Sequence, residues 1–83
     1  MPRNVDIDSP TVKAITFDED LGKRTLRGID IFSDGDLSIT DIEGETVTVT
    51  IPDTAIPFRW VVQIRTVNTS GTTIAASDLL GLR

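Results

Sequence analysis

The fold of this 83-residue chain is decided by the stretch Pro57-Phe58-Arg59-Trp60-Val61-Val62-Gln63-Ile64-Arg65-Thr66-Val67. Its β-branched and aromatic residues predict one long strand. The apolar side chains fall on both faces of that strand, which is typical of a strand covered on both sides. We expect one face to form the protomer's core and the other to meet a neighbouring subunit. The core face would hold Phe58, Trp60, Val62 and Ile64, and the neighbour's face Val61 and Val67 beside Arg59 and Arg65.

Short β-rich segments separated by turn residues make up most of the remaining chain. Strands are predicted at 11–17, 24–32, 37–42 and 46–51, and in the final apolar run to Leu82. No segment shows the sustained 3.6-residue apolar period of a helix. The fold is therefore predicted to be all-β, a small antiparallel sandwich or barrel of roughly six strands with an extended N-terminal arm. Residues 1–20 would be the arm and first short strand, and residues 21–83 a single β-domain.

Three features punctuate these strands. Asp34-Gly35 predicts a tight hairpin, because glycine adopts the positive φ angles that such turns need. Glu43-Gly44-Glu45 predicts a second turn, and the Val/Thr alternation after it predicts a half-buried strand with threonines outward. In a regular strand over 24–32, Leu26 would face one side of the sheet and Ile29 and Ile31 the other, with Gly28 between them. A β-bulge at Gly28 would place all three apolar side chains on a single face. The break at 18–22 is interpreted as a loop, with one helical turn as the alternative.

Size and composition favour self-association. A chain of 83 residues buries a modest share of its surface, so its stability is marginal without a further constraint. Cysteine and histidine are both absent, which excludes disulfides and the usual structural zinc sites. Oligomerisation is the constraint that remains, so we expect a homo-oligomer. Neither a signal peptide nor a membrane-length apolar run is visible, so the chain is expected to be made in the cytoplasm with no membrane partner.

The charge distribution is uneven. The net charge is -5, but the acidic residues concentrate in residues 1–53, whereas residues 54–83 carry Asp78 as their single acid. An electrically polar protomer would suit head-to-tail packing; alternatively, a meander scatters both sequence halves over the whole surface. The chain has no basic cluster of the kind that dominates phosphate binding, so nucleic acid is not an expected partner.

Catalytic and metal sites are not expected. Without His or Cys, the common nucleophile-and-base arrangements are missing, so we predict no enzymatic activity and no cofactor. Asp30, Asp34 and Asp36 bring carboxylates near one turn, but their spacing does not fit an EF-hand loop. Turn chemistry explains the same residues, so no metal site is predicted.

Two apolar features are candidates for contacts. Trp60 is interpreted as a core residue, with a subunit contact or an exposed platform for sugar stacking as alternatives. The end of the chain is difficult to bury fully in so small a domain. It supplies a second candidate interface, formed by Leu79, Leu80 and Leu82.

The succession of motifs resembles a known family over residues 25–83. Leu26-Arg27-Gly28-Ile29 is followed by a Gly-Asp hairpin, by Leu37-Ser38-Ile39 and by the Val/Thr strand. A proline-bounded link then leads into a Pro-Φ-Arg strand, and Thr66-Val67 precedes the loop Ser70-Gly71-Thr72-Thr73. This order is similar to that of the head spike base proteins of tailed phages and gene transfer agents. The chain departs from that pattern after Asp78, where Leu79 to Arg83 continues.

The resemblance implies a structural virion protein. Such a protein would form a ring on the capsid surface at the fivefold vertices and carry a spike or fibre. Its expected partners are copies of itself (a pentamer before a trimer), the major capsid protein and the spike or fibre protein. It would be made in the bacterial host cytoplasm. The alternatives are another virion component, such as a decoration protein or a neck or tail ring, and a small carbohydrate- or surface-binding β-module.

Overall fold

A computed structural model describes residues 12–22 and 24–83 of the chain. Its regular elements are seven strands and two short 3₁₀ turns, and all strand pairs are antiparallel, which confirms the predicted all-β class. The strands are β1 (Val12–Ala14), β2 (Gly28–Ile31), β3 (Gly35–Asp41), β4 (Thr46–Ile51), β5 (Phe58–Trp60), β6 (Ile64–Asn68) and β7 (Leu79–Leu82). The 3₁₀ turns are η1 (Asp53–Ala55) and η2 (Ala76–Asp78).

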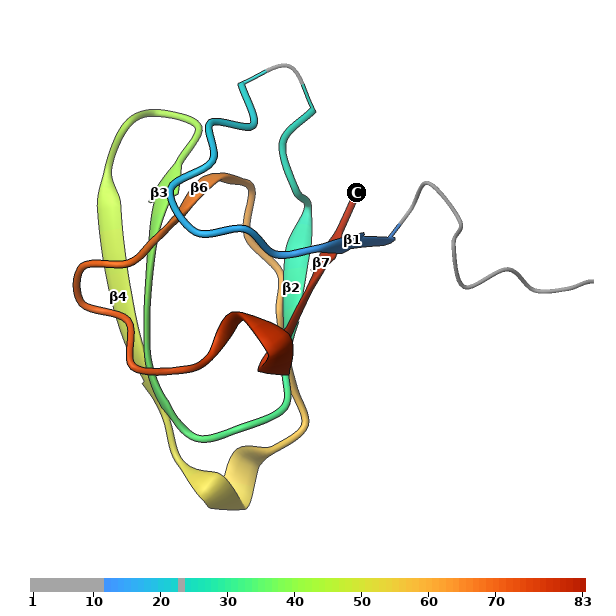
Figure 1. Ribbon diagram of the computed structural model, residues 1–83, viewed down its shortest axis with the longest axis vertical. Coiled ribbons are helices and arrows are strands. Elements are labelled where there is room, and N and C mark those ends of the chain that lie inside the picture. The colour runs from blue at the N-terminus through green and yellow to red at the C-terminus, as the bar shows by residue number, and fades with distance from the viewer. Residues whose placement is uncertain (1–11, 23) are drawn as a thin grey trace, which may run out of the picture.

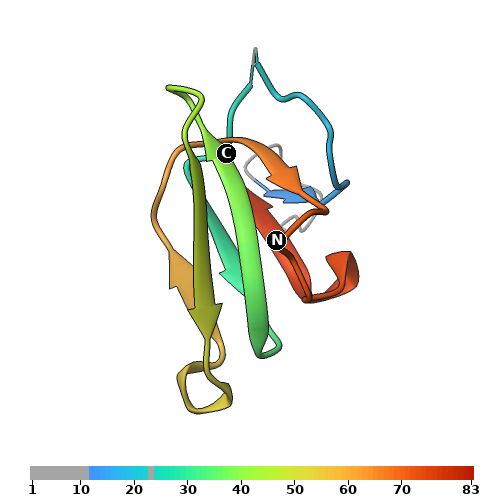
Figure 2. The ribbon, with the colours of Figure 1, turned by 90° about the vertical axis from the view of Figure 1, so that its left-hand side faces the viewer.

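The strands form two sheets. The four-stranded sheet, called sheet A, has the order β1-β7-β2-β5, and the three-stranded sheet B has the order β4-β3-β6. Figure 1 shows sheet B on the left and sheet A to its right, with the loops closing the two ends. Figure 2 turns sheet B toward the viewer, with β4 and β3 running side by side. The arrangement is a small sandwich.

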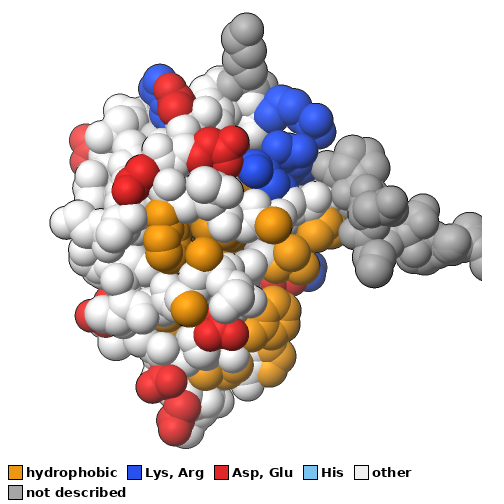
Figure 3. Space-filling model, in the orientation of Figure 1, with side chains coloured by type: hydrophobic (Ala, Val, Ile, Leu, Met, Phe, Trp, Pro, Cys, Tyr) orange, Lys and Arg blue, Asp and Glu red, His pale blue; other side chains and the backbone are white. Residues whose placement is uncertain are grey.

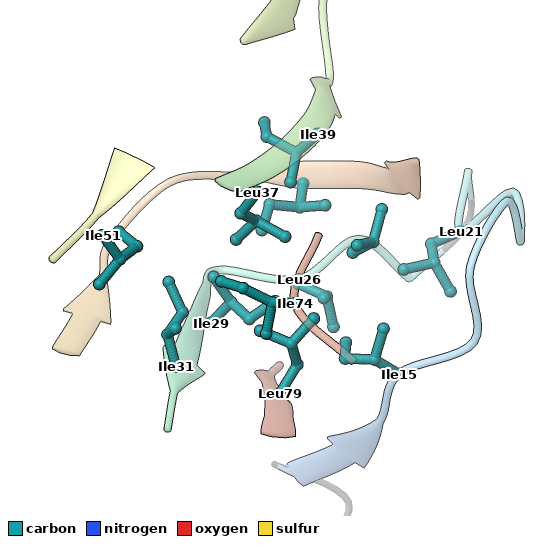
Figure 4. Packing of buried hydrophobic residues seen from close by; sticks show 12 residues of the cluster. Ile15, Leu21, Leu26, Ile29, Ile31, Leu37, Ile39, Ile51, Ile74 and Leu79 are labelled. Atoms are coloured by element: carbon teal, nitrogen blue, oxygen red, sulfur yellow. The ribbon is translucent and has the colours of Figure 1, made fainter. Parts of the chain in front are cut away.

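The core lies between the two sheets. Both sheets and the loops at their ends contribute apolar side chains to it, and Figure 4 shows these side chains converging from the two sides. Sheet A supplies Ile29, Ile31 and Leu79; sheet B supplies Leu37, Ile39, Ile51, Ile64 and Val67; the remaining segments supply Ile15, Leu21, Leu26 and Ile74. Alternation along the strands explains this arrangement, because every second residue of a strand faces the opposite sheet.

The prediction of one long strand over 58–67 is wrong. The chain forms β5 in sheet A, leaves it after Trp60, and re-enters regular structure at Ile64 as β6 in sheet B. The apolar residues on both strand faces therefore reflect a crossing between sheets. β6 contains a further irregularity: the register with β3 shifts between Thr40 and Asp41, so that Arg65 is an extra residue. This bulge turns Ile64 and Val67 to the same side, and both are buried in the core.

The core face predicted for the long strand is correct in part. Ile64 is fully buried, and Trp60 and Val62 are partly buried against the core. Phe58, by contrast, is 36% exposed, because it is the first residue of β5, which is an edge strand of sheet A. Burial therefore decreases toward the end of the segment that lies farthest from the crossing.

The predicted hairpin at Asp34-Gly35 is also wrong, although the backbone prediction holds. β2 and β3 pair with other strands and belong to different sheets, so residues 32–34 cross from sheet A to sheet B. Gly35 has φ +134°, a region that favours glycine. A Cβ at this position would also lie 2.6 Å from the Thr73 hydroxyl. The glycine is thus required by a crossover and not by a hairpin.

The second predicted turn forms the β3–β4 hairpin. Gly44 has φ +86°, and the Asp41 carboxylate accepts hydrogen bonds from the backbone N–H groups of Glu43 and Glu45, both at 2.9 Å. In β4 the threonines are exposed, while Val47 and Val49 are half-buried and Ile51 is buried. The alternation predicted for this strand is confirmed.

The β-bulge predicted at Gly28 is absent, because residues 24–32 do not form one continuous strand. Leu26 forms an isolated bridge with Ile64 of sheet B, and β2 begins only at Gly28. Leu26, Ile29 and Ile31 are nevertheless all fully buried, so the single apolar side that was expected is present. The Leu26–Ile64 bridge ties the two sheets together along one side.

The N-terminal arm lies largely outside the described residues, which begin at 12. Within them, β1 pairs with β7, and Ile15 belongs to the core, so residues 12–20 are packed on the domain. Asp18 has φ +63°, and the segment 18–22 forms a turn followed by irregular backbone. The alternative of one helical turn at 18–22 is therefore wrong.

The Gly-Thr-Thr loop completes the hydrogen bonding of β3. The Thr72 hydroxyl accepts from the N–H of Ser38 at 2.9 Å, and the Thr73 hydroxyl accepts from the N–H of Asp36 at 2.8 Å. The N–H of Thr73 donates to the carbonyl of Asp36. Side-chain oxygens therefore replace strand carbonyls beyond the end of β6, which satisfies backbone groups that would otherwise lack partners.

Candidate interaction surface

The face of sheet A that points away from the core brings together several of the residues predicted for subunit contact. Leu80 of β7 pairs with Asp30 of β2, and Asp30 pairs in turn with Arg59 of β5. Leu82 lies two residues along β7 on the same face, which is opposite to that of the buried Leu79. We call Asp30, Arg59, Leu80 and Leu82, with Phe32 at their end, the outer face of sheet A.

An ion pair fixes the polar part of this face. The Arg59 guanidinium binds the Asp30 carboxylate through two bonds, Nε to Oδ1 at 2.7 Å and Nη2 to Oδ2 at 3.0 Å. The hydrogen bond and the charge of Asp30 raise the pKa of Arg59. Two parallel bonds hold the planar guanidinium in one orientation. Arg59 is exposed and Asp30 is half-buried, so the pair adds little to stability, but it neutralises the charge of both groups on this face.

Phe32 extends this face at one end, and Phe58 lies at the neighbouring edge of β5. Phe32 follows β2 and is 49% exposed, and Phe58 begins β5 directly opposite Ile31. Together with Pro57 they border a shallow hollow whose other walls are Asp30 and Arg59. Figure 3 shows apolar side chains gathered along the right-hand flank of the molecule, the side on which Figure 1 places sheet A.

The residues predicted for an interface do not form one surface. Arg59, Leu80 and Leu82 lie on the outer face of sheet A, and both leucines are half-buried there. Val61 stands in the crossing segment next to β5 and is 79% exposed, the largest exposure among the exposed large apolar residues of the described chain.

The prediction that Val67 and Leu79 belong to an interface is wrong. Val67 is 1% exposed and Leu79 is 4% exposed, because both point between the sheets. Val67 faces the core because the bulge at Arg65 shifts the alternation of β6. Leu79 faces the core because burial alternates along β7, with Leu79 and Gly81 on the inner side. Neither side chain is available on the protomer's surface.

Arg65 belongs to a different region. Its Nε lies 3.1 Å from Asp20 Oδ1 on the exposed side of the 18–22 loop. The hydrogen bond and charge of Arg65 lower the pKa of Asp20 and, reciprocally, Asp20 raises the pKa of Arg65. Arg65 therefore holds the 18–22 loop against β6, in sheet B, whereas Arg59 lies on β5, in sheet A.

Sequence reasoning missed Phe32 as a surface residue. The signal was its alternation with Asp30, since residues two apart on a strand share a face. The placement of Leu80 and Leu82 beside Arg59 depends on the β7–β2 register, which is a non-local pairing that no local pattern specifies.

No family model, no curated protein and no solved structure matches the chain. Among residues 12–22 and 24–83, no group of three or more His, Cys, Asp or Glu side chains is placed to hold a metal ion. The same residues contain no helix long and apolar enough to cross a membrane.

Proposed function

We propose that this chain is a structural virion protein of the head spike base type, which forms a ring on the capsid surface and carries a spike or fibre. The proposal rests on the order of motifs along residues 25–83 and is supported by the role of the Gly-Thr-Thr loop. In the structure this loop is an integral part of sheet B, since its hydroxyls complete β3. Because the loop completes the backbone hydrogen bonds of β3, its Gly-Thr-Thr sequence is tied to this fold and supports a comparison with other proteins that carry it.

The outer face of sheet A supports the assembly part of the proposal. Exposed aromatic residues are enriched in protein interfaces, and Phe32 lies beside the Asp30–Arg59 ion pair on the face that also carries two half-buried leucines. We assign this face, with Val61 at its β5 edge, to contacts between neighbouring subunits of the ring. A ring of five is favoured over a trimer, with the major capsid protein beneath it and the spike or fibre protein above.

Another virion position, such as decoration or a neck or tail ring, is the second candidate, because the same face would serve equally well there. A carbohydrate-binding module is less well supported. The Trp60 side chain is partly buried against the core. A stacking platform needs an open aromatic face, which this environment restricts.

The decisive experiment tests whether the chain is present in purified virus-like particles. Phage or transfer-agent particles from the strain that encodes it are separated on a density gradient and probed with an antibody against the chain. Co-sedimentation with capsids, and labelling at their vertices by immunogold electron microscopy, are the expected results. Intact capsids that lack the chain overturn the virion assignment. Capsids labelled evenly over their faces favour the decoration role instead.

Subunit number is tested separately by native mass spectrometry of the purified chain, with Phe32→Ser as the variant. A pentamer that Phe32→Ser dissociates is expected. Because Phe32 is half exposed, this variant should still fold, which circular dichroism checks. A ring that persists unchanged in Phe32→Ser overturns the assignment of the outer face of sheet A.

A further inference from the structure

The four edge strands of the sandwich differ in how much free backbone they offer. β1 and β5 contain three residues each, and Pro57, which lacks an N–H, precedes β5. The edge of β6 is occupied: its carbonyls at Ile64, Arg65 and Val67 accept bonds from the N–H groups of Leu26, Leu21 and Asp18. β4 spans Thr46–Ile51 and lies at the outer side of sheet B, as Figure 1 shows. Within the described chain, it has the longest uncovered edge.

The hydrogen-bond pattern identifies which groups of β4 point outward. On the side of β3 away from β4, the N–H groups of Ser38 and Asp36 bond to the Thr72 and Thr73 hydroxyls. In an antiparallel pair, residues alternate between bonding to one side and to the other. The partners of Ser38 and Asp36 across β4 are Thr48 and Thr50. Their backbone groups, and those of Thr46 by the same alternation, therefore point to the free edge.

The sequence of this edge is symmetric about its centre. Residues 46–50 read Thr-Val-Thr-Val-Thr, so the order is the same in both directions from Thr48. A second copy placed antiparallel across a two-fold axis at Thr48 would pair Thr46 with Thr50 and Thr48 with its own counterpart. Each of these threonines would exchange both backbone bonds with its partner. The half-buried valines would meet valines on the core side, and threonines would meet threonines outside.

We propose that β4 is a docking edge for β4 of a second copy of this chain, paired antiparallel about Thr48. The contact is a two-fold one in which the same strand serves both copies. It uses sheet B and not the outer face of sheet A, so it stands independently of the proposed virion ring. The strand carries no charge or proline between Thr46 and Ile51, the devices by which edge strands avoid pairing.

Charges beyond the strand ends give the contact a salt dependence. In this register Glu43 and Glu45 approach Ile51, Pro52 and Asp53 of the second copy, so carboxylates of like sign face one another at both ends. Salt screens such repulsion, since the Debye length falls from about 10 Å at 0.1 M to about 3 Å at 1 M ionic strength. Pairing through β4 should therefore strengthen as salt is raised.

Single-cysteine variants test the register directly, because the natural chain contains no cysteine. Cα atoms of a hydrogen-bonded antiparallel pair lie about 5.5 Å apart, within the range of about 4.4 to 6.8 Å that a disulfide spans. Thr48→Cys is thus expected to form a covalent dimer rapidly under mild oxidation, seen on a non-reducing gel. Thr46→Cys is the matched control. Its two sulfurs would be separated by about 13 Å along the strand, and it should cross-link only when mixed with Thr50→Cys.

Equal cross-linking of Thr48→Cys and Thr46→Cys overturns the proposal, as does failure of both. A second variant, Thr48→Pro, removes an N–H that points outward and bonds to none of the residues that the structure describes. In the Phe32→Ser background, which removes the proposed ring contact, it should weaken self-association about tenfold or more by sedimentation, because both central donors are lost. Phe32→Ser protein whose association falls as salt is raised, or a folded Phe32→Ser/Thr48→Pro variant that associates as well as Phe32→Ser alone, contradicts pairing through β4.

Discussion

The two edges of sheet B have opposite surroundings. At β6 the residues 18–22 and 24–26 run along the strand and supply backbone donors to its carbonyls, with Leu21 inserted into the core. At β4 the backbone groups of Thr46, Thr48 and Thr50 point away from the sheet, with no partner strand on that side among the described residues. The difference shows that the irregular residues 18–22 and 24–26 cover one edge. The other edge is left regular and uncharged.

The covering of the β6 edge should depend most strongly on Leu21. Its side chain is 8% exposed and anchors the segment that covers β6. Leu21→Ala is expected to lower the free energy of unfolding by about 2 to 4 kcal/mol, through lost burial and the cavity left behind. Urea denaturation followed by Trp60 fluorescence measures the loss. Val61→Ala, at a site 79% exposed, is the control and should change stability by less than about 0.5 kcal/mol.

The threonine loop beside β6 should have a smaller effect. Thr72→Val keeps the shape of the side chain but removes the acceptor of the Ser38 N–H, and Ser38 is 2% exposed. Leaving a buried donor without a partner should cost about 1 to 2 kcal/mol. The matched control is Thr48→Val on the open edge, where no side-chain bond to residues 12–22 or 24–83 is lost. Equal stabilities of the two variants would contradict the structural role of the loop.

Acid should weaken the covered edge through Asp18. Hydrogen bonds from the Thr69 hydroxyl and N–H, at 2.7 and 3.0 Å, lower the pKa of Asp18 below its ordinary value of 3.8. A carboxylate whose folded pKa is lowered adds stability above pH 3.8 and loses it as the pH falls through the folded pKa. Wild type should therefore lose stability between pH 5 and pH 2 more steeply than Asp18→Asn. Urea titrations across about this range measure the two slopes, and identical slopes would refute the role of Asp18.

The open edge should reveal itself in backbone exchange with almost no effect on stability. In dilute protein the amides of Thr46, Thr48 and Thr50 should exchange with deuterium faster than those of Val47 and Val49, which bond to β3. Exchange followed by NMR resolves the alternation. At high protein concentration the three threonine amides should become protected if β4 pairs with a second copy. Uniform protection along β4 in dilute protein would show that its edge is covered in some other way.

Local patterns were sufficient where structure is local. The turn at Glu43-Gly44-Glu45 and the alternation of 46–51 were predictable because a hairpin and its strand are specified by neighbouring residues. The crossing at 61–63 was not, because its position depends on the Leu26–Ile64 bridge and on the bulge at Arg65. Both are pairings between distant segments.

The same distinction explains the candidate surface. Arg59, Leu80 and Leu82 were singled out from the sequence, and the sheet register brings them to one face. Val67 was assigned to the wrong side because strict alternation was assumed across a position where one residue is extra. The Asp34-Gly35 turn shows the complementary error: its glycine conformation was correct, but a positive φ angle serves a crossover as well as a hairpin.

The covering of β6 also limits how far copies of this chain could associate through sheet B. A sheet with two free edges can add copies without end, as fibrils do. Here a partner joined at β4 would present only its own occupied β6 edge to the outside. Growth through sheet B would therefore stop at a pair, because residues 18–22 and 24–26 already occupy the β6 edge and would leave an uncharged Val/Thr edge able to add one partner only.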